Sequence, residues 1–233
     1  FDVAVLPFYP VSDAGMKIAA HMYNKGKGAN GKTDRVVFGK ILTDEMKEAL
    51  VWDVERGAPN KIMERPWQCC NCIGDWHYNT DVYEKGRYKN AATIAKLLVD
   101  IVSKNGNMLL SVPLRADGTP DEKELAIMKE FGTWMKINKE SIVKTRPWKI
   151  FGEGPIANAD IKINAQGFND GQYTKAGSEE IRFTQSKDGN VVYVTALAWP
   201  KDQSVKVRAL SEGNALCPQN IKKIELLGYD TQI

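Results

Sequence analysis

No stretch of this sequence is apolar over the roughly 18 residues that a membrane-spanning helix needs, so no such helix is expected. The chain also lacks tracts of one charge. Its 32 Lys and Arg residues are interspersed with 29 Asp and Glu residues, which argues against a nucleic-acid-binding or anionic-membrane surface. A glycine-rich phosphate loop is missing too, which argues against a doubly wound nucleotide-binding sheet. What remains, with 43% hydrophobic and 26% charged residues, is the composition of a globular protein.

Cysteine and histidine are scarce, yet three of the four cysteines fall in the stretch RPWQCCNCIGDWHYN. Cys69 and Cys72 have the C-x-x-C spacing of a zinc or redox site. A structural zinc ion takes four ligands, and the other candidates in the sequence are Cys70, His77 and the distant Cys217. A redox C-x-x-C begins a helix, whereas this one lies in an apolar run. We therefore expect small, buried strand residues and no metal site.

Apolar runs and helical patterns alternate in the first part of the chain. The clearest helix is NAATIAKLLVDIVSKNG, whose Ile and Leu residues follow the i, i+3, i+4, i+7 pattern. This alternation predicts an α/β fold with a parallel sheet and outer helices, in the manner of a TIM-type β/α barrel. The expected elements are a helix at 12–24, strands at 35–40 and 50–55, a helix at 90–106, a strand at 107–113 and a helix within 115–138.

The pattern changes near TRPWKIFGEGP, where Pro and Gly residues indicate a linker. Beyond it, short runs alternate between apolar and polar residues, which predicts an antiparallel all-β region. We therefore expect one domain at 1–145 and a second at 146–233. The expected strands lie within 180–185, 190–200, 204–211 and 220–228.

Carboxylates near predicted strand ends are the candidates for chemistry. Asp53 and Glu55 alternate with apolar residues in the strand at 50–55, so they share one face. In β/α barrels, catalysis takes place at the carboxyl ends of the strands. Two such carboxylates with tryptophans nearby fit glycoside hydrolysis. The alternative is a structural salt bridge between these carboxylates and Arg56. Asp2, considered without any family comparison, is interpreted as a charged residue at the chain terminus.

Three longer stretches resemble one known family. They are VERG with RPWQCCNCIGDWHYN, AKLLVDIVSKNGNMLLSVPLRADGTPDE, and WMKINKESIVKTRPW. In this order and with few gaps, they closely resemble the α-L-fucosidases of glycoside hydrolase family 29. The resemblance covers residues 1 to about 150 closely and the rest more loosely. It implies that 1–145 form the C-terminal half of a TIM-type β/α barrel and that 146–233 form a partial antiparallel β-sandwich.

The resemblance also implies roles for individual residues in a retaining exo-glycosidase. Asp2 matches the family's nucleophile, and Glu55 resembles the acid/base of one bacterial branch. Trp76 matches an aromatic residue that packs on the fucose ring. Further substrate-binding residues implied by the resemblance are Trp67, His77 and Lys40. The implied chemistry uses two carboxylates, with no metal and no cofactor.

The implied substrate is a fucosylated oligosaccharide or glycoconjugate, and the implied location is secreted, periplasmic or lysosomal. The family's N-terminal half-barrel, which precedes the nucleophile, has no counterpart in this sequence. We therefore expect an internal piece of a fucosidase that is inactive or very weak by itself. Two alternatives stay open: a non-catalytic carbohydrate-binding or relic fragment of the same fold, and a Cys/His metal protein.

Overall fold

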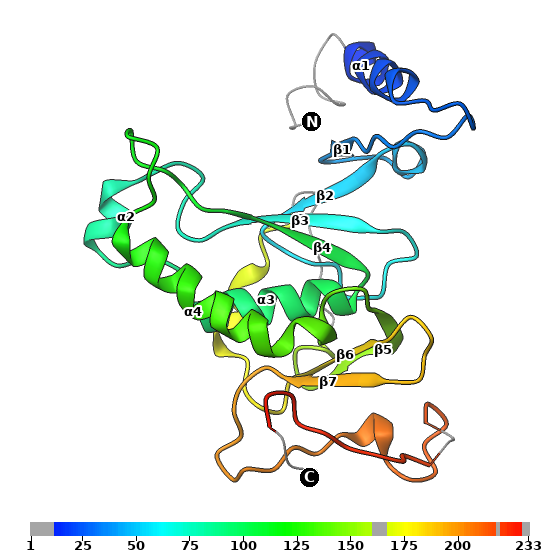
Figure 1. The fold of residues 1–233 in the computed structure, drawn as a ribbon, viewed down its shortest axis with the longest axis vertical. Coiled ribbons are helices and arrows are strands. Elements are labelled where there is room, and N and C mark those ends of the chain that lie inside the picture. Colours follow the sequence, from blue (N-terminus) through cyan, green and yellow to red (C-terminus); the bar gives the residue numbers. More distant parts are fainter. Residues whose placement is uncertain (1–11, 160–166, 218–219, 230–233) are drawn as a thin grey trace.

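The computed structural model describes residues 12–159, 167–217 and 220–229. Asp2, the predicted nucleophile, lies outside these residues, so its separation from Glu55 stays untested. The described residues form a parallel and an antiparallel sheet, with one long helix between them (Figure 1).

The parallel sheet has four strands in the order of the sequence. Parallel neighbours need a long crossover connection, and the chain supplies a helix between the last two strands. The strands are β1 (Phe38–Gly39), β2 (Val51–Glu55), β3 (Trp67–Cys72) and β4 (Gly106–Ser111). The predicted strands at 35–40, 50–55 and 107–113 are confirmed, although β1 is shorter than predicted.

The helices begin where side chains can cap them. Asn90 accepts a hydrogen bond from the Thr93 amide before the third helix, and Asp121 and Glu124 form a reciprocal capping box at the fourth. The helices are α1 (Ser12–Lys25), α2 (Thr80–Glu84), α3 (Ala91–Ser103) and α4 (Glu122–Asn138), with short 3-10 helices η1 (Met46–Glu48), η2 (Lys139–Ser141), η3 (Asp170–Lys175) and η4 (Arg208–Leu210). The three predicted helices are confirmed. No helix in the described part of the chain is long and apolar enough to cross a bilayer.

The antiparallel sheet begins where the sequence pattern changes. Its strands are β5 (Arg146–Glu153), β6 (Ile181–Gln185) and β7 (Val192–Ala196). The strands predicted within 180–185 and 190–200 are confirmed, but those at 204–211 and 220–228 are wrong. Val205, Ile221 and Ile224 are 40–57% exposed there. An alternating pattern forms a strand only where its apolar face packs against neighbours.

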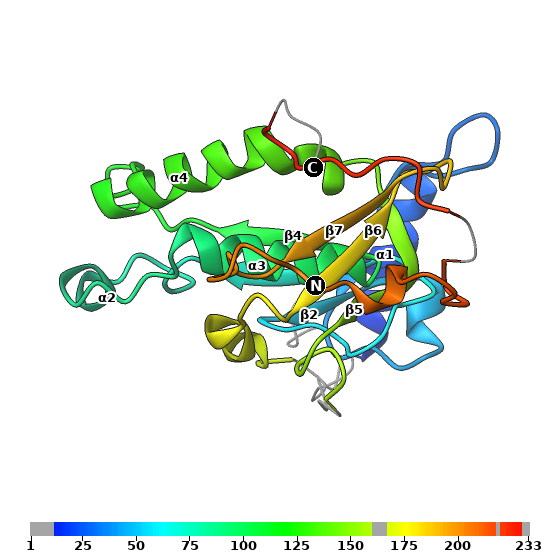
Figure 2. The same cartoon turned by 90° about the horizontal axis from the view of Figure 1, so that it is seen from below.

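One core joins the two sheets. Val54 and Trp67 of the parallel sheet pack with Ile101 of α3 and with Tyr173 and Leu197 from the C-terminal part. Seen from below, β6 and β7 cross over α3 (Figure 2). The antiparallel sheet therefore covers α3 on the side away from the parallel sheet.

A buried ionic network lies in the same interface. The carboxylate of Asp100 in α3 accepts hydrogen bonds from Lys104 Nζ at 2.8 Å, Tyr173 OH at 2.6 Å and Arg182 Nε at 2.5 Å. Arg182 Nη1 also lies 3.1 Å from Glu180 Oε2. Each of these five residues is at most 1% exposed. Charged hydrogen bonds therefore link α3 to the C-terminal part of the chain.

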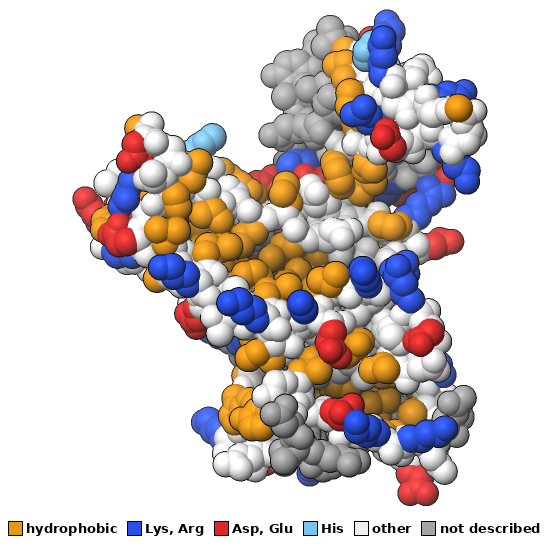
Figure 3. Space-filling view, viewed as in Figure 1, with side chains coloured by type: hydrophobic (Ala, Val, Ile, Leu, Met, Phe, Trp, Pro, Cys, Tyr) orange, Lys and Arg blue, Asp and Glu red, His pale blue; other side chains and the backbone are white. Residues whose placement is uncertain are grey.

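The surface of the molecule is apolar around β4. Figure 3 shows apolar side chains across the middle of this view, where β4 lies in Figure 1, and Lys and Arg side chains along α4. Leu109 in β4 and Leu114 after it are 56% and 53% exposed. Because β4 is the edge strand of the described sheet, its side chains lack a neighbouring strand on that side.

Candidate active site

Asp53 and Glu55 lie on the face of the parallel sheet that points away from the shared core. Val54, between them, is fully buried in that core. In the register of β2 and β3, Asp53 pairs with Gln68 and Glu55 pairs with Cys70. Because side chains alternate along both strands, these four polar side chains share one face.

Lys40, directly after β1, joins the two carboxylates. Its Nζ lies 3.1 Å from Asp53 Oδ2 and 3.6 Å from Glu55 Oε2, and it donates to Cys70 Sγ at 2.7 Å. Gln68 Nε2 donates to the other oxygen of Asp53 at 3.1 Å. The side chains of Lys40 and Asp53 are 10% and 11% exposed, and that of Glu55 is 17% exposed. Glu55 is therefore the most accessible of the three charged groups.

Arg56 does not pair with these carboxylates. Its φ is 49°, and its Nε lies 3.4 Å from Asp170 Oδ2 in the C-terminal part. Asp170 also lies 3.4 Å from Lys89 Nζ and accepts a hydrogen bond from Asn71. The alternative drawn from the sequence, a salt bridge between Arg56 and the neighbouring carboxylates, is wrong.

The contacts of Lys40 with Cys70 and Asp53 change the pKa values in this cluster. Burial by itself lowers the pKa of its ammonium group, but the hydrogen bond with Cys70 and the charge of Asp53 outweigh burial and raise this pKa. Burial raises the pKa of the Cys70 thiol to about 11, although the hydrogen bond from Lys40 acts in the opposite direction. At neutral pH, Lys40 is therefore a cation, and it holds two carboxylates close together.

The loop after β3 carries Trp76, the residue that was predicted to pack on the sugar. Asp75 orders this loop by accepting hydrogen bonds from the Trp76 amide at 2.7 Å and from Asn79 Nδ2 at 3.0 Å. Gly74 lets the chain pass Tyr88, since a Cβ atom there would lie 2.7 Å from its ring. Trp76 is half-buried and His77 is exposed. Because β2 and β3 are parallel neighbours, this loop leaves the edge of the sheet at which Glu55 lies.

Trp67 does not lie with the other predicted site residues. Its side chain is 1% exposed and packs in the shared core, and its indole N–H donates to the Lys104 carbonyl at 2.9 Å. The substrate-binding role predicted for Trp67 is therefore wrong in this structure. Trp67 is the first residue of β3, and its side chain points to the α3 side of the sheet.

The three clustered cysteines are buried and free, as predicted for strand residues. Cys69 and Cys72 are an odd number of positions apart in β3, so their side chains point to opposite faces. Within the described ranges, no group of three or more His, Cys, Asp or Glu side chains has a metal-binding arrangement. The C-x-x-C spacing thus reflects strand sequence rather than a paired site.

Two polar neighbours of the site, Gln68 and Cys70, were not predicted. They meet the carboxylates through the register of two strands. Asp170, the partner of Arg56, was not predicted either, and it comes from more than 100 positions away in the chain. Strand alternation in WQCCNC indicates which residues share a face, but it does not reveal the neighbouring strand. The contacts of Gln68 and Cys70 with this site can therefore be predicted only if the pairing of β2 with β3 is known.

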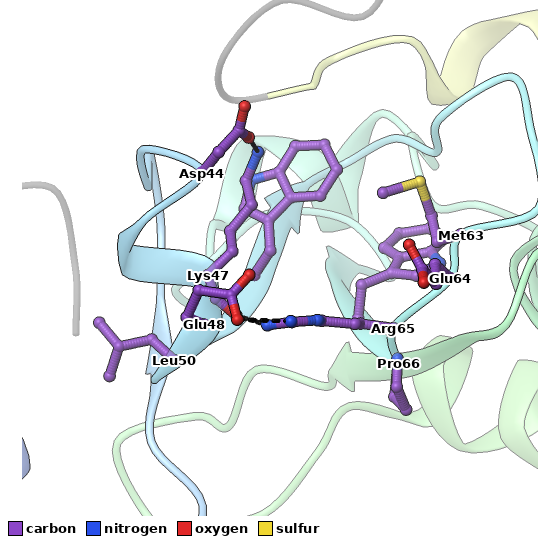
Figure 4. Close-up of a pocket in the computed structure, with 10 residues that line it drawn as sticks. Asp44, Lys47, Glu48, Leu50, Met63, Glu64, Arg65 and Pro66 are labelled. Atoms are coloured by element: carbon purple, nitrogen blue, oxygen red, sulfur yellow. Dashed lines mark hydrogen bonds and ion pairs between the residues drawn. The ribbon is translucent and has the colours of Figure 1, made fainter.

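A separate cavity of about 190 Å³ lies at the amino ends of β2 and β3 (Figure 4). Arg65 pairs with Glu48 across it at 2.5 Å, and Lys47 lies 4.8 Å from the centre of the Trp52 ring. Because Glu55 lies at the opposite end of β2, this cavity is distinct from the carboxylate cluster.

Comparison with known proteins decides the family. A family model described as "Alpha-L-fucosidase" matches residues 9–140, and one described as "Alpha-L-fucosidase C-terminal domain" matches residues 175–233. The chain belongs to the alpha-L-fucosidase family. The family predicted from the sequence motifs is therefore confirmed.

Relatives of this chain include an alpha-L-fucosidase of Dictyostelium discoideum, 37% identical over 93 residues, and a plasma alpha-L-fucosidase of Rattus norvegicus, 25% identical over 177 residues. The matches cover 40% and 75% of this chain but only 20% and 32% of the two relatives. A solved alpha-L-fucosidase structure superposes with a TM-score of 0.58 at 22% identity, over 84% of this chain and 38% of that one. This likeness supports the fold.

Proposed function

We propose that the protein containing this chain hydrolyses terminal α-L-fucosides, with Glu55 as general acid/base. The observation that carries this proposal is the cluster of Lys40, Asp53 and Glu55, which places two carboxylates at the carboxyl end of a parallel strand in a chain of the fucosidase family.

We further propose that 1–145 form the C-terminal half of a β/α barrel and that 146–233 form part of a β-sandwich domain. The order β3–α2–α3–β4–α4, with β3 and β4 parallel neighbours, supports the first part. The antiparallel order β5–β6–β7 supports the second. In a barrel of this kind, Glu55 and the loop with Trp76 belong to the face where substrates bind.

The proposed mechanism is a double displacement with retention of configuration. Asp2 attacks the anomeric carbon while Glu55 protonates the leaving oxygen, and Glu55 then takes a proton from the water that releases fucose. This role requires about 5–5.5 Å between the two carboxyl groups. In this proposal Lys40 also binds the substrate, and its ion pairs with Asp53 and Glu55 position its ammonium group.

The proposed substrates are fucosylated oligosaccharides or glycoconjugates, and the proposed location is outside the cytosol, in the medium, periplasm or lysosome. The support is the family assignment together with relatives named as plasma and tissue alpha-L-fucosidases.

The stereochemistry of the first product tests this proposal. We expect the protein to release fucose from an aryl α-L-fucoside, and NMR spectra taken in the first minutes to show the α-anomer before mutarotation. Initial release of the β-anomer would contradict a retaining mechanism. Fucose binding without any release would favour the carbohydrate-binding alternative.

Trp76 provides a test of substrate contact. We expect Trp76→Ala to raise KM for the aryl fucoside by roughly 2- to 12-fold, because a stacked aromatic contact contributes about 0.5–1.5 kcal/mol. The unfolding midpoint should change little, since Trp76 is only half-buried. Trp199, which is 70% exposed after β7, supplies the control Trp199→Ala. Equal KM values for the two variants would remove Trp76 from the substrate site.

A further inference from the structure

Lys40 and Cys70 make an unusually close contact for an amine and a thiol. The Nζ–Sγ distance is 2.7 Å, at the short end of the range of about 2.7–3.2 Å for N–H···O hydrogen bonds. Because sulfur is larger than oxygen, an ordinary N–H···S contact is longer. Lys40 is 9% and Cys70 7% exposed, so packing from two strands holds the pair together.

The neighbours of the pair supply what a reaction between them needs. Asp53 Oδ2 and Glu55 Oε2 lie 3.1 Å and 3.6 Å from Lys40 Nζ. Lys40 is a cation beside them, and either carboxylate is close enough to accept the proton that its ammonium group loses when a new bond forms at Nζ. The proposed hydrolysis uses two carboxylates, so the thiol of Cys70 has no part in it.

We propose that Lys40 and Cys70 form an oxidation site, at which a peroxide-class oxidant links the two side chains through one oxygen atom as an Nζ–O–Sγ bridge. This inference goes beyond the proposed hydrolysis and does not depend on it. The bridge would take Lys40 out of its ion pairs with Asp53 and Glu55, so oxidation would act directly on the carboxylate cluster.

The chemistry balances with two molecules of hydrogen peroxide. The first oxidises the thiol to a sulfenic acid: the O–O bond breaks, an S–O bond forms and one water leaves. The second accepts two further electrons while an N–O bond forms between the Lys40 amine and the sulfenic oxygen. The amine proton and the sulfenic proton leave in two more waters.

The other cysteines of β3 lack this arrangement. Cys69 is on the opposite face, where its Sγ contacts the Cys70 carbonyl at 3.7 Å, and burial raises its pKa further, to about 12. Cys72 Sγ contacts the Gly74 carbonyl at 3.7 Å. Lys89 Nζ donates to the backbone carbonyl of Cys72. These two cysteines therefore provide matched controls in the same peptide.

Peptide mapping after peroxide treatment tests the proposal on the whole chain. Trypsin does not cleave after a modified lysine, so the bridge joins residues 36–47 to residues 62–85. We expect the linked mass to equal the two peptides plus one oxygen less two hydrogens, and peptide 36–40 to be lost from the map. A thiol reductant should restore both peptides.

Variants assign the link to the two residues. We expect it to vanish in Cys70→Ser and Lys40→Arg and to persist in Cys69→Ser and Cys72→Ser. If a variant does not fold, fragmentation of the linked wild-type peptides identifies the joined residues. Oxidation of Cys70 only to a sulfinic or sulfonic acid, with residues 36–40 recovered free, would overturn the proposal, and so would recovery of Cys70 in its reduced form.

Discussion

Replacing Glu55 with Gln is expected to lower kcat for hydrolysis of a fucosylated glycan by about 10²–10⁴-fold, the usual contribution of general acid–base catalysis. The amide keeps the size of the side chain but cannot donate a proton to the leaving oxygen. Glu55 is 17% exposed, compared with 11% for Asp53, so it is better placed to meet a substrate. The measurement is kcat and KM for the protein containing this chain and for its Glu55→Gln variant.

A second substrate separates a catalytic role for Glu55 from a structural one. An aryl fucoside with a very acidic leaving group needs no protonation, so Glu55→Gln should slow the first step of its hydrolysis much less than that of a glycan. Azide, a nucleophile that needs no general base, should then restore turnover of the fucosyl-enzyme and yield a fucosyl azide. A misfolded variant would show neither effect.

Asp53→Asn is the matched control for this experiment. Asp53 is bound by Lys40 and Gln68, and the amide would weaken the ion pair that positions Lys40. We expect a loss of activity that is similar for good and poor leaving groups and is not rescued by azide. If Asp53→Asn shows the leaving-group dependence and the azide rescue instead, then Asp53 is the acid/base and the role proposed for Glu55 is wrong.

The helices and the parallel strands could be predicted because each depends on local pattern. The apolar positions of α3 repeat at helical spacing over its whole length, and its capping Asn90 directly precedes it. Strand alternation likewise placed Asp53 and Glu55 on one face. Such information lies within a few consecutive residues, where a sequence can be interpreted without knowledge of its partners.

Contacts between distant segments could not be predicted in this way. Arg56 turns to Asp170 rather than to the adjacent Glu55, and Lys40 meets Cys70 only because β1, β2 and β3 are neighbours in the sheet. Trp67 matched a family motif, but alternation within β3 directs it into the core. The strands predicted at 204–211 and 220–228 failed for a related reason, since the sequence does not show whether a partner strand exists.

Asp100→Asn is expected to destabilise the fold by about 3–5 kcal/mol, because removing one partner of a buried ion pair leaves an uncompensated charge. The Asp100 carboxylate is fully buried and accepts hydrogen bonds from Lys104, Tyr173 and Arg182. Without its charge, the two cations would face each other in the shared core, with Glu180 as the nearest remaining anion of this network. Urea unfolding followed by circular dichroism measures the change.

Two further variants provide smaller losses of folding stability with which Asp100→Asn can be compared. Tyr173→Phe removes one hydrogen bond to Asp100 but no charge, so a loss of about 1 kcal/mol is expected. Asp13→Asn breaks the exposed ion pair between Asp13 and Lys17, and little change is expected because exposed pairs contribute little. If Asp100→Asn costs no more than Tyr173→Phe, the network does not stabilise the junction between α3 and the C-terminal part.

Acid provides an independent test of the same network. Burial raises the pKa of the Asp100 carboxyl, but the charges of Lys104 and Arg182 outweigh burial and hold it below its ordinary value. A carboxyl whose pKa is lower in the folded than in the unfolded state stabilises the fold above the unfolded value of about 3.9, and this contribution disappears as the pH falls below it. The wild-type chain should therefore lose more stability than Asp100→Asn between about pH 5 and pH 3. Parallel pH profiles for the two proteins would mean that the pKa of the Asp100 carboxyl is the same in the folded and unfolded states, so that the network does not stabilise its charge. A wild-type chain that gains stability relative to Asp100→Asn as the pH falls would mean that Asp100 is protonated in the folded state.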